Sequence, residues 1–122
     1  MKTGNVIQEK SYAFALKVVK LSRCLIEEKK EFVLSRQLLK SGTSIGALVE
    51  EAIGGQTSKD FYAKMTIAYK EARETRYWLR LLCDTDFIEY FESQELIAEV
   101  DELLKIIGSI QKTMKKKIEN DE

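Results

Sequence analysis

Residues 58–82, SKDFYAKMTIAYKEARETRYWLRLL, decide the fold class because their apolar side chains recur at the spacing of a helix. Steps of three and four residues place seven side chains, six of them apolar, on one stripe, namely Phe61, Met65, Ala68, Ala72, Thr75, Leu79 and Leu82. At the start of this segment, Thr57 and Asp60 have the spacing of a capping box, in which Asp60 can reach back to free amides. The segment therefore predicts a long amphipathic helix with one buried face.

Three further segments repeat this periodicity. One helix is predicted over about residues 6–28, another from Ser35 as N-cap to a stop at Gly54-Gly55, and the last from near Ser93. Their inward stripes are Ile7, Ser11, Phe14, Val18, Leu21 and Leu25, then Leu38, Gly42, Ile45, Val49 and Ala52, and finally Leu96, Val100, Leu103, Ile107, Ile110 and Met114.

Four long helices with short connections predict an all-α, up-down-up-down antiparallel four-helix bundle, with residues 1–122 as a single domain. The absence of proline agrees with long helices. A single long coiled coil is the alternative, but Gly54-Gly55 and residues 83–92 interrupt the pattern. We expect the apolar residues of the second interruption to fold back over the bundle end, namely Phe87, Ile88, Tyr90 and Phe91.

The composition argues against catalysis and against metal binding. The chain has no histidine, which is the commonest general base and the commonest metal ligand among side chains. Glutamates in the middle of the chain have lysine and arginine neighbours, so ion pairing accounts for them. No glycine-rich phosphate loop follows a strand. We therefore predict no enzyme activity, no cofactor, no metal site and no small-molecule substrate.

Charge, cysteines and hydropathy indicate a cytoplasmic protein. Twenty basic and twenty acidic residues give a net charge of zero, which leaves no broad basic field but allows local patches. Cys24 and Cys83 form no CxxC pair and are expected to be reduced, partly buried thiols. The N-terminal residues lack the apolar core of a signal peptide, and no run of ~18 apolar residues could span a membrane.

Gly42 and Gly46 are unusual because glycine inside a helix costs about 1 kcal/mol relative to alanine. Small residues four positions apart let another backbone approach closely, so we predict tight packing of this helix on a neighbour. The alternative is a kink or a late helix start at this point.

Aromatic and basic side chains form a flank beside the stripe of residues 58–82. At about 100° per residue, the flank holds Tyr62, Tyr69, Arg73, Arg76, Tyr77 and Arg80. Such a flank can grip phosphates and stack on bases, it is equally typical of a protein–protein interface, and it can be an ordinary polar face paired with glutamates. The sequence leaves these three interpretations open.

The other flank of the same helix is apolar. Ile67, Trp78 and Leu81 lie outside the core stripe, so the helix is apolar around more of its circumference than one bundle face requires. We predict that these residues contact another subunit. The alternative is that Trp78 is covered by Phe87 or Phe91, which would leave a monomer.

Residues 41–82, SGTSIGALVEEAIGGQTSKDFYAKMTIAYKEARETRYWLRLL, resemble the four-helix-bundle proteins encoded in intervening sequences of bacterial large-subunit ribosomal RNA genes. The core of the resemblance covers about residues 35–82, and the helix layout extends it along the chain. Its most specific parts are the Ser-Ile-Gly-Ala segment, the Glu-Glu pair and the Lys-Glu-Ala-Arg-Glu-Thr run. The accessory protein of diversity-generating retroelements is a more distant member of the wider family.

The resemblance implies a bundle that assembles into a ring, a homopentamer in characterised relatives. For the retroelement relative it also implies binding to a reverse transcriptase and to nucleic acid through a basic surface. We therefore predict a non-enzymatic, homo-oligomeric accessory or scaffold protein that binds another macromolecule. The alternative is a nucleic-acid-binding module that uses Tyr69, Arg73, Arg76, Tyr77 and Arg80 on RNA or single-stranded DNA.

Overall fold

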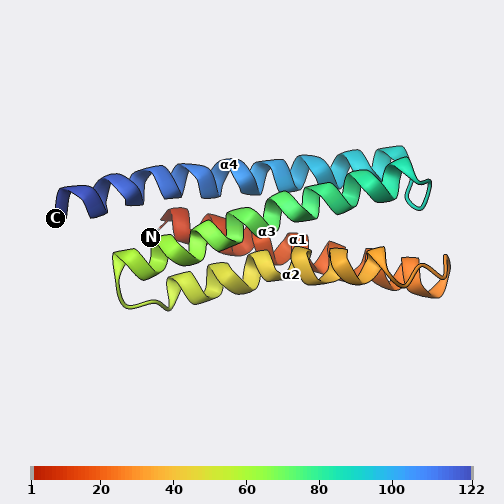
Figure 1. Ribbon diagram of the computed structural model, residues 1–122, viewed down its shortest axis with the longest axis horizontal. Coiled ribbons are helices and arrows are strands. Elements are labelled where there is room, and N and C mark those ends of the chain that lie inside the picture. Colours follow the sequence, from red (N-terminus) through yellow and green to blue (C-terminus); the bar gives the residue numbers. More distant parts are fainter. Residues whose placement is uncertain (1, 122) are drawn as a thin grey trace.

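The computed structural model describes residues 2–121, which form four helices that run alternately in opposite directions (Figure 1). They are α1 (Lys2–Glu27), α2 (Leu34–Ile53), α3 (Ser58–Asp84) and α4 (Tyr90–Asp121). Each helix packs against the next along the chain, and α1 closes the bundle against α4 through a looser contact. The predicted antiparallel four-helix bundle is confirmed, and the alternative of a single coiled coil is wrong.

The start of α2 is capped by Glu31 and not by Ser35, so that prediction is corrected. The Glu31 carboxylate accepts the backbone amides of Ser35 at 2.7 Å and Leu34 at 3.1 Å. The Ser35 hydroxyl donates instead to the Glu31 carbonyl at 2.7 Å. Partial burial opposes ionisation of Glu31, but the hydrogen bonds outweigh it and hold the pKa of this carboxyl below its ordinary value of 4.5.

The turn between α2 and α3 begins at the two glycines, as predicted. Neither glycine adopts a positive φ, so the left-handed conformation common at helix ends is not used here. A Cβ at Gly55 would instead collide with the Asp60 carboxylate. The Thr57 hydroxyl accepts the amide of Asp60 at 3.0 Å, which is one of the two contacts of a capping box.

The connection from α3 to α4 is shorter than predicted, because α4 begins at Tyr90 and not near Ser93. Ile88 is buried and Phe87 is half-buried against the core, so both fold back over the bundle end. Tyr90 and Phe91 do not fold back, and the Phe91 side chain is 82% exposed. The additional turn at the start of α4 places both rings on the outside of the helix.

The core is built from the predicted stripes, whose members are buried except for the half-buried Phe61. The α4 stripe is wider than predicted and also buries Ile97 and Leu104. Each fully buried aliphatic or aromatic side chain contributes about 1.5–3 kcal/mol. Between α2 and α3 the hydroxyls of Ser41 and Thr75 lie 2.9 Å apart, which satisfies a buried polar contact.

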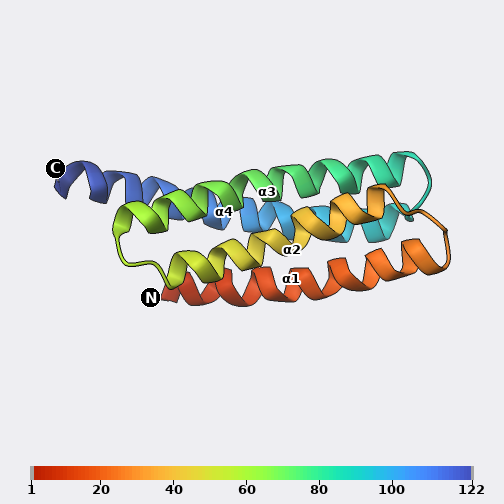
Figure 2. The same ribbon diagram turned by 60° about the horizontal axis from the view of Figure 1, so that its bottom comes forward.

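The close helix approach lies between α1 and α2. A Cβ at Gly42 would be 2.8 Å from Cγ1 of Val18, whereas a Cβ at Gly46 would be 3.5 Å from the Ser11 carbonyl oxygen, an ordinary contact. The helix begins at Leu34 and is continuous through both glycines, so the alternative of a late start is wrong. Seen from the side of α2, the chain shows α1 and α3 flanking that helix (Figure 2).

Candidate protein and nucleic-acid interfaces

The predicted subunit-contact residues lie on the flank of α3 that adjoins α2. Lys64 Nζ is 3.0 Å from the Glu51 carboxylate of α2, and Ile67 follows Lys64 by one helical turn. Ile67 is 46% exposed, while Leu81 and Trp78 are half-buried. We call Ile67, Trp78 and Leu81 the α2/α3 face.

Trp78 is held in place by local contacts. Its indole Nε1–H donates to the Glu74 carboxylate at 3.0 Å, and its ring meets that of Tyr77 edge-on at 5.0 Å. The ring also packs against the hydrophobic core. Phe91, which the sequence offered as a cover for Trp78, points to solvent instead, so that alternative is wrong for Phe91.

A partly desolvated carboxylate lies on the same flank. Burial, reinforced by the nearby charge of Glu74, raises the pKa of Glu71, and Lys40 of α2 opposes the shift. Any molecule that covered the α2/α3 face would remove more water from Glu71.

A second apolar area, which the sequence interpretation missed, lies where α1 adjoins α2. The Gln8 amide donates to the Glu50 carboxylate of α2 at 2.7 Å, and Tyr12 follows Gln8 by one turn. Tyr12 is 66% exposed, Leu16 is 49% exposed, and Ile53 of α2 is also exposed. We call Tyr12 and Leu16 the α1/α2 face. Its signal in the sequence is the helical spacing of Tyr12, Leu16, Val19 and Ile26 beside the core stripe.

The tyrosine–arginine flank of α3 faces α4 and is partly used by that contact. Arg76 Nε lies 2.8 Å from Oδ1 of Asp101, and half-buried Tyr69 packs beside Gly108. Arg73, Tyr77 and Arg80 are exposed. The five predicted residues therefore divide into two that join the α3–α4 contact and three that remain open to solvent.

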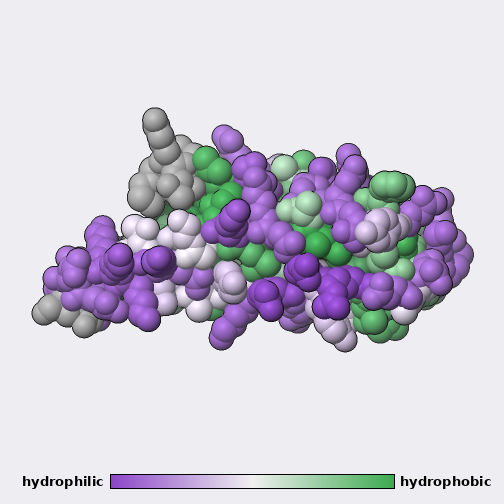
Figure 3. Space-filling model, turned by 90° about the horizontal axis from the view of Figure 1, so that it is seen from above, coloured by the Kyte–Doolittle hydropathy of each residue, from purple (hydrophilic) through white to green (hydrophobic). Residues whose placement is uncertain are grey.

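This flank continues onto α4. The continuation could not be predicted from residues 58–82 alone. Lys105, Lys112 and Lys115 are exposed and follow Asp101 at helical spacing. Because Arg76 meets Asp101 and Tyr69 meets Gly108, Lys105 lies near Arg73, while Lys112 and Lys115 lie further toward the start of α3, where Lys115 lines a pocket with Tyr62. The cations therefore form an extended row along the two helices on a molecule whose net charge is zero. We call Arg73, Arg80, Lys105, Lys112 and Lys115 the α3/α4 face. The view onto α4 shows hydrophilic side chains over much of this side and over the projecting end of the helix (Figure 3).

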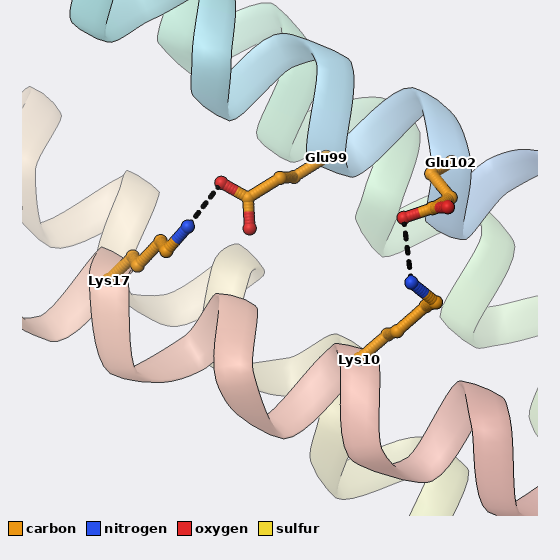
Figure 4. A network of polar contacts seen from close by, with 4 residues as sticks. All are labelled: Lys10, Lys17, Glu99 and Glu102. Carbon is orange, nitrogen blue, oxygen red and sulfur yellow. Dashed lines mark hydrogen bonds and ion pairs between the residues drawn. The ribbon is translucent and has the colours of Figure 1, made fainter.

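Ion pairs connect α1 and α4, where the helices approach less closely. Lys17 Nζ is 2.8 Å from the Glu99 carboxylate and Lys10 Nζ is 3.2 Å from that of Glu102 (Figure 4). The hydrogen bond that Lys17 donates to Glu99, together with the negative charge of Glu99, raises the pKa of Lys17. Because these pairs are largely exposed, each contributes about 0–1 kcal/mol.

Within residues 2–121, no three or more Cys, Asp or Glu side chains are grouped so that they could hold a metal ion. None of the described helices is long and apolar enough to cross a membrane. The fold, with its exposed helix faces, defines a small antiparallel four-helix-bundle protein.

The chain belongs to the family of 23S rRNA-intervening sequence proteins, whose model matches residues 4–109. A solved structure of a Bacteroides thetaiotaomicron protein, described as a protein with unknown function from the S23 ribosomal protein family, is 44% identical. The match covers 90% of this chain and 98% of that one, with a TM-score of 0.89. No curated protein matches the chain. The family resemblance seen in the sequence is confirmed, and the more distant resemblance to the retroelement accessory protein stays a prediction.

Proposed function

We propose that this chain is a non-enzymatic accessory protein that assembles as a homo-oligomer, a pentameric ring, and binds another macromolecule. The observation that carries the proposal is the pair of apolar faces on either side of α2. Exposed Tyr12 and Leu16 lie on one and exposed Ile67 on the other. Side chains of this size lose unfavourable contact with water when a second subunit covers them.

The angle between the two faces supports a small closed ring. In a square bundle, two faces that share one helix point about 90° apart. A ring closes when each subunit uses two different faces whose directions differ by about 90° for four subunits or about 108° for five. Faces on opposite sides of the bundle would favour an open filament. The homopentamer implied by the family resemblance falls in this range.

Such a ring has a defined orientation. The two contact faces flank α2, so α2 lies toward the centre of the ring and α4 toward the outside. The α3/α4 face and both ends of the bundle then remain accessible to another macromolecule.

Aspartate substitutions test the two faces separately. Leu16→Asp and Ile67→Asp are each expected to lower the mass measured by light scattering after size exclusion, while helical circular dichroism is retained, because both side chains are substantially exposed. Ser109→Asp on exposed α4 surface is the matched control and should leave the mass unchanged.

Mixing the variants tests whether the contact joins two different faces. Leu16→Asp retains an intact α2/α3 face and Ile67→Asp an intact α1/α2 face, so the mixture should form dimers that neither variant forms alone. A ring that survives both substitutions, or a mixture without dimers, would argue against this assembly.

The second candidate function is nucleic-acid binding through the α3/α4 face. Exposed Arg73 and Arg80 of α3 and exposed Lys105, Lys112 and Lys115 of α4 favour it, with Tyr77 available for stacking. Binding driven by phosphate contacts should weaken steeply as salt rises, whereas an apolar protein contact should not.

A further inference from the structure

A cavity of about 920 Å³ opens at the end of the bundle where α1 and α3 finish and α4 begins. Buried Leu21, Leu25 and Ile88 form its inner lining. Tyr90 and Phe91 lie at its rim, exposed by 66% and 82%, with their rings edge-to-face at 6.1 Å. The cavity therefore has an apolar interior and an aromatic rim that the fold itself does not cover.

The charges around the cavity are mostly negative. Four carboxylates line it, those of Asp84, Asp86, Glu89 and Glu92, against one cation, Lys29. The carboxyl ends of α1 and α3 also lie here, and neither helix has a basic residue in its last turn to offset the negative end of its dipole. The positive ends of α2 and α4 are offset by Glu31 and Glu92.

Carboxylates beside exposed aromatic rings are the partners that a guanidinium or ammonium group prefers. We infer that this cavity docks a cationic segment of a partner protein, in which arginine or lysine flanks an apolar side chain. The cation pairs with Asp84, Asp86 and Glu89 and packs on Phe91, while the apolar side chain enters toward Ile88. The inference rests on the proposed binding of another macromolecule and names the chemistry of that partner.

The geometry favours a peptide segment over a single ion. The cavity volume exceeds that of one side chain, and its lining contains both apolar and acidic groups. It opens at the end of the bundle between α1, α3 and α4 and shares no lining residue with the two faces that flank α2, so we expect it to stay open in the assembled ring.

Peptide binding tests the inference directly. A fluorescent twelve-residue peptide of alternating arginine and leucine should bind the full chain at low salt, and its fluorescence polarisation should fall as salt rises. The same peptide with glutamate in place of arginine should not bind. Absence of binding by the arginine peptide at low salt would overturn the inference.

Two variants locate the site. Phe91→Ala removes a side chain that is 82% exposed and so leaves the fold intact, and it should weaken binding about tenfold. Asp84→Asn/Asp86→Asn/Glu89→Gln should weaken it about tenfold or more. The control triple variant Glu9→Gln/Glu119→Gln/Asp121→Asn makes the same change of net charge on exposed surface and should bind as the wild type. Binding as tight as that of the wild type, by either Phe91→Ala or the acidic-site variant, would overturn the inference.

Cys24 and Cys83 both line the cavity and report its occupancy. The Cys24 thiol donates to the Glu28 carboxylate at 3.0 Å, which raises its pKa, so alkylation by iodoacetamide is followed at mildly alkaline pH. Saturating arginine peptide should slow alkylation of both thiols, and unchanged rates would place the peptide elsewhere.

A second copy of this chain is the rival occupant. The projecting end of α4 carries exposed Lys115, Lys116 and Lys117, which could enter the cavity of another copy. Replacing all three with glutamine tests this. If the protein then loses self-association, the cavity holds another copy and the inference is overturned. The mass of the assembly is measured separately, so failure of peptide binding leaves the proposed ring untouched.

Discussion

Replacing Gly42 with alanine tests how closely α1 and α2 approach. The new Cβ would lie 2.8 Å and 2.9 Å from the two γ-methyl carbons of Val18, which is fully buried. Rotating Val18 exchanges one collision for the other, because both methyls are close and a β-branched side chain has one preferred rotamer in a helix. The helices must shift or the core must overpack, which costs about 1–3 kcal/mol.

Helix propensity acts in the opposite direction. Alanine is favoured over glycine by about 1 kcal/mol in a helix interior, so Gly42→Ala should be net destabilising by about 1 kcal/mol. At Gly46 a Cβ would meet the Ser11 carbonyl oxygen at 3.5 Å, an ordinary contact. Gly46→Ala should therefore gain most of the helix-propensity advantage of alanine over glycine and stabilise the fold by about 0.5–1 kcal/mol.

Urea unfolding followed by far-UV circular dichroism, at one protein concentration because association shifts apparent stability, measures both changes. The two substitutions should change the free energy of unfolding in opposite directions, and this difference is the test. If Gly42→Ala stabilises the protein as much as Gly46→Ala does, α1 and α2 are not in close approach at Val18. Adding Val18→Ala to Gly42→Ala should recover part of the loss, since the colliding methyls are gone.

Three further predictions concern the cap, the basic face and metal. Glu31→Gln should destabilise the fold by about 1 kcal/mol at neutral pH. Because the pKa of Glu31 in the folded protein is held below 4.5, its stabilising contribution is present above that pH and is lost as pH falls through the folded pKa. Urea unfolding at acidic pH should therefore give the variant and the wild type the same free energy of unfolding. Replacing Arg73, Arg76 and Arg80 together with glutamine should abolish the weak low-salt binding expected for short single-stranded RNA and DNA; tight binding that survives would place the site elsewhere. Elemental analysis of the purified protein should find no stoichiometric transition metal, and one or two tightly held ions per chain would contradict the reasoning from composition.

The core could be predicted from the sequence because each stripe depends on spacing within one helix. Met65, Ala72 and Leu79 repeat at seven residues, and any partner that the bundle supplies must cover that face. The stop at Gly54-Gly55 and the cap at Thr57 are also local, since both involve atoms a few residues apart.

The helix starts were less predictable because several residues compete for the same amides. Ser35 has good N-cap chemistry, but the longer side chain of Glu31 reaches three successive amides from the preceding turn. A carboxylate in that position shifts the helix start toward the N-terminus. Near Tyr90 the sequence contains no strong breaker, so α4 gains a turn that the pattern did not require.

The composition of the surfaces was harder to predict because it depends on the register between neighbouring helices. The periodicity of a single helix gives no information on that register. Whether Arg76 is free or paired depends on Asp101 standing opposite it, and that follows from the length of the α3–α4 connection. The α1/α2 face was missed for the same reason: it depends on the antiparallel packing of α1 on α2, which places Gln8 beside Glu50 and Ser11 beside Gly46.

The mass of the wild-type protein in solution tests the central claim most directly. Size exclusion coupled to light scattering at micromolar concentration should give roughly 70 kDa, the mass of a closed ring of five copies of 14.1 kDa each. The value should stay constant over a tenfold dilution, because a closed ring gains all its contacts at once. A mass near 14.1 kDa would contradict the assembly, and a mass that keeps rising with concentration would indicate an open filament instead of a ring.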